Sequence, residues 1–306
     1  MMQSKIESII EECRKYTREG EVASYIPELK KADKDALGIY IDKLDGNEFC
    51  AGDYDTKFTI QSISKIIALI IAIMDNGMEK VLSKVGVEPS AYSFNSIVTL
   101  EVKNANKPLN PMINAGAIAT VSLIRGNSPE EVIERILEFT KKVTGNKNIK
   151  VNEEVYQSEK KTGDRNRSLA YFMKGTGVIE KDVEKVLDAY FQQCSIEVTC
   201  KDIAKIASFL ANDGVLPSTG ERIIPAEVAK IVKAVMVTCG MYDASGSFAV
   251  KVGIPSKSGV GGGILATVPG VMGIGVFGPA LDKKGNSIAG VKVLERLSEE
   301  LNLSIF

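Results

Sequence analysis

The most hydrophobic part of the chain is an unbroken run of nine apolar residues at positions 66–74. A helix that is apolar on every side belongs in the core of a large protein, and the run falls short of the ~20 residues needed to cross a bilayer. The pattern therefore predicts a buried central helix. Ser62 and Lys65 stand three residues apart at its start, so we expect their side chains on one helix face.

Further elements are predicted on both sides of this helix. Residues 4–18 carry apolar side chains at helical spacing and stop at Gly20, which predicts an amphipathic surface helix. Alternating residues 37–44, a turn at 45–47 and a return at 48–53 predict an antiparallel hairpin. Downstream, the pattern predicts helices over 128–144, 181–194, 199–212 and 225–238, and a loop at 163–166.

Strand spacing returns near the end of the chain, at 247–253, 258–268 and 271–277, before a closing helix over 286–301. Two strands before the helical block and three after it predict one five-stranded antiparallel sheet, flanked by helices and completed by both ends of the chain. The fold class is α+β. The predicted division places the sheet and the central helix in residues 1–74 and 239–306, and an inserted all-helical subdomain in 75–238.

Composition limits the chemistry. A net charge of -1 offers no electrostatic footprint for nucleic acid or an anionic membrane surface. The chain has no histidine, which excludes Ser-His-Asp and Cys-His sites and every histidine-ligated metal centre. If the protein is an enzyme, its base is Lys, Tyr, Glu or Asp.

The five cysteines are odd in number and form no C-x-x-C pair, which argues against a disulfide framework or a zinc site. They are typical of reduced thiols in a cytosolic protein. Charged residues are spread through positions 1–20, so the apolar core of a signal peptide is missing there. We expect a cytoplasmic protein.

The pair Ser62 and Lys65 is a candidate nucleophile and base. A serine hydroxyl needs a neighbouring base, and a lysine can serve as one when burial disfavours its charged form. The motif alone is weak, because a chain of this length should contain about one or two Ser-x-x-Lys matches by chance. A second copy, Ser158 to Lys161, lies among charges and predicts a surface turn.

Two glycine-rich stretches differ in what they indicate. Residues 273–278 match G-x-G-x-x-G, but Pro279 follows where a dinucleotide site needs a helix, so no such site is predicted. Lys257, Ser258 and Gly259 begin a strand whose glycines would let a ligand approach the backbone; a bulged, tightly packed strand is the alternative.

The order of hairpin, S-x-x-K, helical block and late Lys-Ser-Gly resembles the serine β-lactamase and penicillin-binding protein class. More closely, the chain resembles the bacterial-type glutaminases. The stretches that carry this resemblance are VASYIP (22–27), QSISK (61–65), NPMINAGAI (110–118), GDRN (163–166), YFQQCSIEV (190–198), and GMYD (240–243) through KSGV (257–260).

The resemblance implies a β-lactamase/transpeptidase-like fold and hydrolysis of L-glutamine to L-glutamate and ammonia through an acyl-enzyme, with no cofactor or metal. It implies Ser62 as nucleophile, Lys65 as base, and Tyr242 as proton relay with Tyr25 nearby. The amides of Ser62 and Val260 would form the oxyanion hole. The substrate's ammonium and carboxylate would be held by Asn114, Glu159, Asn166 and Tyr190, with Lys257, Ser258 and Gly259 in support.

The residue types suit this chemistry. A zwitterionic amino acid needs an anion for its ammonium and neutral donors for its carboxylate. Asn114 could instead cap a helix, and Tyr190 could be a core aromatic. Two other hypotheses stay open: a β-lactam-reactive hydrolase or peptidase of the same fold, and a non-catalytic amino-acid sensor. The resemblance also implies a homodimer or homotetramer.

Overall fold

The computed structural model describes residues 2–98, 100 and 107–306. Five strands form one antiparallel sheet in the order β2-β1-β7-β6-β5, as the sequence pattern predicts. The strands are β1 (Gly38–Lys43), β2 (Glu48–Gly52), β5 (Ser256–Ser258), β6 (Gly263–Val268) and β7 (Met272–Phe277). A separate two-stranded pair joins β3 (Phe58–Thr59) to β4 (Glu197–Val198).

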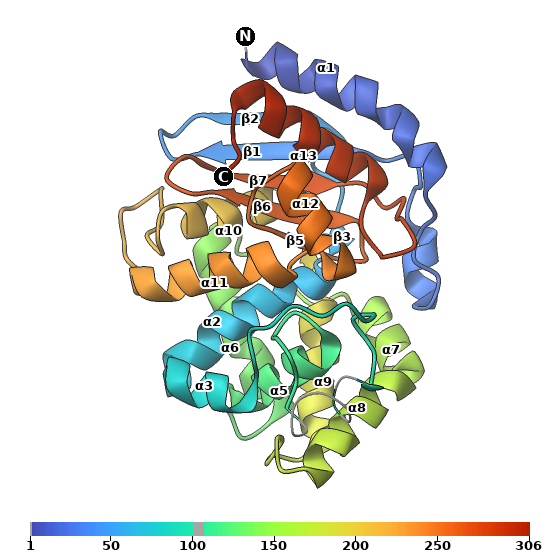
Figure 1. Ribbon diagram of the computed structural model, residues 1–306, viewed down its shortest axis with the longest axis vertical. Coiled ribbons are helices and arrows are strands. Elements are labelled where there is room, and N and C mark those ends of the chain that lie inside the picture. Colours follow the sequence, from blue (N-terminus) through green and yellow to red (C-terminus); the bar gives the residue numbers. More distant parts are fainter. Residues whose placement is uncertain (1, 99, 101–106) are drawn as a thin grey trace.

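Helices cover both faces of the sheet (Figure 1). The terminal helices α1 (Met2–Arg14) and α13 (Ile288–Leu301) pack on one face of the sheet and share an apolar core with it. On the other face α10 (Cys200–Ala211) lies directly against β7, where side chains at Gly273 and Gly275 would collide with its backbone. The glycines of the G-x-G-x-x-G match therefore allow this helix to pack closely on the sheet.

The central helix α2 (Ser64–Asn76) is buried along almost its whole length, as the apolar run predicts. It packs against α5 (Asn114–Leu123) and α11 (Ala226–Cys239). The other described helices are α3 (Met78–Lys84), α6 (Pro129–Thr144), α7 (Glu153–Thr162), α8 (Asp164–Gly175), α9 (Val183–Cys194) and α12 (Ser245–Lys251). The domain division stays a prediction; α10, which it assigns to the helical part, packs on the sheet.

Four local predictions are wrong. The strand predicted at 247–253 lies mostly in helix α12, which ends at Lys251, and the predicted strand 258–268 is two strands, β5 and β6, separated by a glycine turn. The predicted number of strands in the sheet is still right, because the strand lost at 247–253 is replaced by the extra strand that the split of 258–268 creates. The expected loop at 163–166 and the expected turn at 158–161 both fall largely in helices, α8 and α7. Polar composition suggested turns there, but tertiary packing decides the helix state.

A charged network holds the C-terminal end of α2. Asp75, whose side chain is only 6% exposed, accepts two hydrogen bonds from Arg135 at 2.6 and 2.7 Å and one from the Arg125 amide at 2.8 Å. Burial alone would raise the pKa of Asp75, but these donors outweigh it and lower that pKa. The network ties α2 to α6 and to the loop after α5.

Replacing Asp75 by Asn should lower the free energy of unfolding by about 2 kcal/mol, since charge-assisted bonds are lost and Arg135 loses its anion. The depressed pKa means that the carboxylate stabilises the fold above the unfolded-state value and ceases to do so as pH falls through the folded-state value. Urea unfolding at pH 7 and near pH 3 checks both points. An equal difference between parent and variant at the two pH values would contradict this account.

Candidate active site

A strained turn presents Ser62. The chain leaves β3 at Thr59, anchors Ile60 through its N–H to the Ile196 carbonyl at 2.8 Å, and makes a 3₁₀ turn over Gln61–Ile63 before α2 begins. Gln61 has φ +48°, a conformation that costs energy in a residue with a side chain. Gly259 and Gly261 pack against this turn. A Cβ on Gly259 would lie 2.8 Å from the Ile60 oxygen, and a Cβ on Gly261 would lie 2.5 Å from the Thr59 oxygen.

Lys65 is the buried amine of the site, with 1% of its surface exposed. Its Nζ donates to the Met112 carbonyl at 3.0 Å and to Asn114 Oδ1 at 2.8 Å. Burial lowers the pKa of Lys65 to about 8, and the nearby Cys194 and Glu159 only partly oppose this. Both hydrogen-bond partners are neutral oxygens, so no salt bridge fixes the charge. A direct bond from Lys65 to Ser62 stays a prediction.

The partners of Lys65 are held by a residue that the sequence analysis did not single out. Asn110 accepts from the amides of Met112 and Ile113 at 3.0 and 3.1 Å, and so shapes the turn that enters α5. Gly116 packs against this turn so closely that a Cβ there would lie 1.8 Å from the Asn110 oxygen. The turn therefore aims the Met112 carbonyl at Lys65.

A pocket of about 80 Å³ opens beside Ser62. Six predicted site residues line it: Tyr25, Ser62, Asn114, Glu159, Asn166 and Tyr190. Asn114 Nδ2 donates to Asn166 Oδ1 at 2.9 Å, so Asn114 links the substrate side of the pocket to Lys65. These residues come from four helices, the Ser62 turn and the segment before the first strand.

Glu159 is a buried carboxylate, 6% exposed, and its Oε1 has no hydrogen-bond partner among the residues that the structure describes. Burial raises the pKa of Glu159 to about 7, against the opposing effects of a hydrogen bond from Gln61 and the charge of Lys65. An unsatisfied buried acceptor that faces a pocket is suited to receive a donor from a ligand.

Tyr242 and Lys257 form the wall behind Ser62. Tyr242 sits at φ +55° and donates from Oη to the Ser258 carbonyl at 3.3 Å. Burial raises the pKa of Tyr242, which a hydrogen bond with Ser62 opposes. The Lys257 amine lies 4.5 Å from the centroid of the Tyr242 ring and donates to the carbonyls of Gly240 and Ser258, at 3.1 and 2.5 Å.

The glycine turn after β5 carries the predicted oxyanion donor. Gly259 and Gly262 are tied into the turn by their amides, whereas the Val260 amide has no hydrogen-bond partner among the described residues. The Ser258 hydroxyl is buried and likewise has no partner there. Burial, and then the charge of Lys65, lowers the pKa of Lys257 well below its ordinary value.

The sequence analysis missed several pocket residues. Gln61 could have been found from its place next to Ser62. The family resemblance runs through four others without assigning them a role: Ile26, Gly163, Arg165 and Cys194. No sequence signal pointed to Phe94, Asn95 or Thr162.

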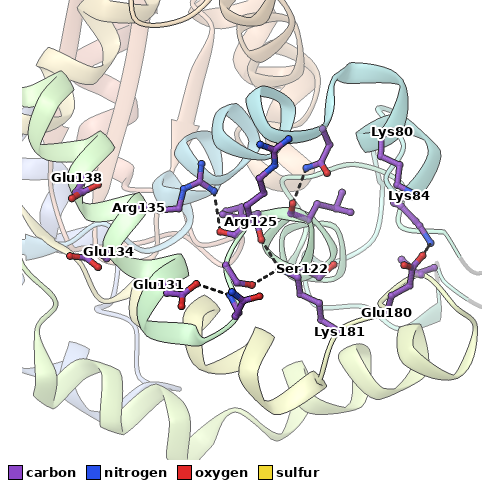
Figure 2. Close-up of a pocket in the computed structure, with 16 residues that line it drawn as sticks. Lys80, Lys84, Ser122, Arg125, Glu131, Glu134, Arg135, Glu138, Glu180 and Lys181 are labelled. Carbon is purple, nitrogen blue, oxygen red and sulfur yellow. Dashed lines mark hydrogen bonds and ion pairs between the residues drawn. The ribbon is translucent and has the colours of Figure 1, made fainter.

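A second, wider cleft of about 840 Å³ contains none of the predicted residues. Figure 2 shows Arg125, Arg135 and Lys181 gathered there from separate elements. Lys181 donates to the carbonyls of Ile124 and Gly126 at the end of α5. Basic side chains at helix C-termini satisfy free carbonyls and oppose the helix dipole. The cleft is thus explained by the helix ends that it contains.

Two other kinds of feature are absent from the described ranges. No three His, Cys, Asp or Glu side chains there are grouped so that they could hold a metal ion. No helix in that part of the chain is long and apolar enough to span a membrane.

Comparisons with known proteins identify the family of this chain. The family model described as Glutaminase matches residues 20–306. A curated glutaminase of Clostridium tetani (strain Massachusetts / E88) is 98% identical over 306 residues, and glutaminase 2 of Clostridium perfringens (strain 13 / Type A) is 64% identical over 305; each match covers 100% of both chains.

Among solved structures, the covalent complex between a Bacillus subtilis glutaminase and 5-oxo-L-norleucine, formed by reaction with 6-diazo-5-oxo-L-norleucine, is 42% identical to this chain. Its TM-score is 0.92, and the match covers 100% of both chains. The predicted α+β fold of serine β-lactamase type is thereby confirmed.

Proposed function

Because this chain belongs to the glutaminase family and hydrolyses L-glutamine to L-glutamate and ammonia, we propose that it does so by a Ser-Lys acyl-enzyme mechanism. The observation that carries the proposal is the buried Lys65 amine, whose pKa of about 8 leaves a usable fraction neutral near neutral pH. Ser62, one turn away at the pocket, is the nucleophile.

The pocket walls match the two ends of the substrate. Glu159 binds the α-ammonium through its unpaired Oε1, and Asn114, Asn166 and Tyr190 bind the α-carboxylate with neutral donors. Tyr25 closes the pocket and positions the substrate. This arrangement leaves the side-chain amide of glutamine directed at Ser62.

The reaction proceeds in two halves. Ser62 Oγ attacks the amide carbon while its proton passes to Lys65, and the oxyanion that forms is held by the amides of Ser62 and Val260. Removing one such donor typically costs about 3 kcal/mol in the barrier. The first amides of a helical segment point outward without partners, and Ser62 occupies such a position.

Tyr242 relays to the leaving nitrogen the proton that Lys65 took from Ser62, so the Lys65 amine and the Tyr242 hydroxyl both return to their starting protonation states. It lies within hydrogen-bond reach of Ser62 and is braced by Lys257 and the Ser258 carbonyl. The C–N bond breaks, ammonia leaves, and an acyl ester remains on Ser62. Water, deprotonated by the same amine, then cleaves the ester to L-glutamate and restores the hydroxyl. No cofactor enters these steps.

The family membership favours this function over a β-lactam-reactive hydrolase or an amino-acid sensor. A cytoplasmic location and a homodimer or homotetramer are further parts of the proposal. Five free cysteines support a reducing compartment, and light scattering on the purified protein tests the assembly.

Ser62→Ala should abolish ammonia release from L-glutamine, because no nucleophile remains. The relative's complex suggests a second readout. In the parent, 6-diazo-5-oxo-L-norleucine should add one 5-oxo-norleucyl group to the peptide that contains Ser62, as peptide mass spectrometry would show. Ser158→Ala, in the other Ser-x-x-Lys copy, is the control and should keep activity and labelling. An adduct elsewhere, or full activity in Ser62→Ala, would refute the assignment.

The rate should depend on pH in two distinguishable ways. Because Lys65 must be neutral to accept a proton, kcat should rise as pH increases through about 8. Because Glu159 must be charged to bind an ammonium, KM should rise as pH falls below about 7. Steady-state kinetics from pH 6 to 9.5 measures both, and a kcat that stays level across that range would exclude Lys65 as the base.

Gly259→Ala should reduce kcat at least about tenfold, because the new Cβ would lie 2.8 Å from the Ile60 oxygen and push the two oxyanion donors apart. The matched control is Gly246→Ala on α12, where an added Cβ meets nothing within 4 Å. Kinetics with a thermal melt on both variants checks this. Equal kcat in the two variants would show that the turns are not in the contact described.

A further inference from the structure

Four side chains of α7 and α9 form a compact polar cluster, here called the α7–α9 clamp: Tyr156, Lys160, Asp188 and Gln192. Asp188 Oδ1 accepts from Tyr156 Oη at 2.6 Å and from the Lys160 amine, and Asp188 Oδ2 accepts from Gln192 Nε2 at 3.0 Å. Lys160 also donates to Tyr156 Oη at 3.0 Å. One carboxylate thus joins two residues of α7 to α9.

Each of the same two helices carries a residue that lines the pocket. Glu159 lies on α7 between the two clamp residues of that helix, and Tyr190 lies on α9 between Asp188 and Gln192. Clamp residues four apart share one helix face. Glu159 and Tyr190 instead line the pocket. The clamp therefore joins the two helices that carry these lining residues.

Glu159 needs such a restraint. A buried carboxylate with an unpartnered oxygen favours any movement that exposes it to water. The helix α7 packs mainly against α9 and the 3₁₀ turn at Pro27–Lys31. Its ends are also held, since Arg167 donates to the Lys160 carbonyl at 2.8 Å and the N-cap Asn152 donates to Glu197 at 3.2 Å. The clamp adds a restraint beside Glu159, between these two ends. At the C-terminal end of α7, Gly163 contacts the Phe191 ring so closely that a Cβ would lie 2.5 Å away.

We propose that the α7–α9 clamp, centred on Asp188, is a positioning device for substrate recognition: it holds Glu159 in the dry pocket against its tendency to move outward, and so sets the affinity for the substrate's α-ammonium. The proposal rests on the function assigned above to Glu159. Asp188 touches neither the substrate nor the reacting atoms and acts through the position of α7.

The clamp should affect substrate binding more than chemistry. Asp188→Asn loses the charge that holds Tyr156 and Lys160, so KM for L-glutamine at pH 8 should rise about tenfold while kcat changes by less than about threefold. Tyr156→Phe removes one donor and should move KM in the same direction by less. Because both act on one contact, their effects on KM should not add.

A pH readout separates positioning from general damage. The titratable groups that face Glu159 are Tyr25, Lys65, Tyr190 and Cys194. Burial raises the pKa of Tyr190 and of the Cys194 thiol, so both stay neutral from pH 5.5 to 8. If α7 relaxes and Glu159 gains water, its pKa falls from about 7, and the rise of KM in acid should begin at a lower pH in Asp188→Asn.

The experiment compares the parent with Asp188→Asn, Tyr156→Phe, their double variant, Glu159→Gln and a control, Asp213→Asn. The control removes another Asp-Lys ion pair, 2.6 Å long, between the end of α10 and α11. KM and kcat are measured from pH 5.5 to 9, with a thermal melt for each variant. Asp213→Asn should leave KM and its pH dependence unchanged.

The outcomes are distinct. Three results together support the clamp. Asp188→Asn has a higher KM with nearly unchanged kcat, its KM begins to rise in acid at a lower pH than in the parent, and its effect on KM does not add to that of Tyr156→Phe. An unchanged KM in Asp188→Asn, or kcat falling as much as kcat/KM, overturns it, provided that Glu159→Gln raises KM. An unchanged KM in Glu159→Gln instead shows that the assigned role of Glu159 is wrong, independently of the clamp. If Asp188→Asn does not fold, Tyr156→Phe decides by the same criteria.

Discussion

A buried amine without a counter-ion is the constraint on which the rest of the structure depends. Lys65 lies in the core with two neutral oxygens as hydrogen-bond partners, so burial disfavours its charge and nothing nearby fully compensates. A carboxylate in direct contact would hold the proton and spoil the base. The surrounding elements offer the Lys65 amine hydrogen-bond acceptors that are neutral, and no carboxylate of the described residues forms a salt bridge with it.

That requirement explains features that look unrelated along the chain. Asn110 and Gly116 shape the turn that offers the Met112 carbonyl, and Asn114 offers its side-chain oxygen from the start of α5. The glycines near Val260 let the β5–β6 turn press against the backbone before Ser62. Each contact depends on local strain or on a missing side chain, and each places backbone groups next to Lys65 or against the turn that carries Ser62.

Glu159, which lines the pocket, and Lys65 are two buried ionisable groups that are kept apart. Glu159 and Lys65 influence one another electrostatically, yet Lys65 donates to other groups and Glu159 keeps one oxygen unpaired. The separation leaves the carboxylate available for a ligand's ammonium. It also makes the burial of Glu159 energetically unfavourable, and in our proposal the α7–α9 clamp opposes the outward movement that would relieve it.

Much of this architecture follows from the sequence alone. The apolar run predicted the buried helix, the alternating segments predicted most of the sheet, and the missing histidine restricted the base to a few residue types. These signals are local or compositional, so they can be recognised in the sequence without knowledge of the tertiary structure. The helix at 245–251, the split of β5 from β6 and the helical state of 164–166 depended on packing against distant segments. Other features were decided only by the tertiary structure. They are the oxygens that accept from Lys65, the burial of Glu159 within a charged stretch, and the link that Asp188 makes between α7 and α9. Such contacts link residues far apart in sequence, and hydrophobic periodicity carries no information about which polar groups meet.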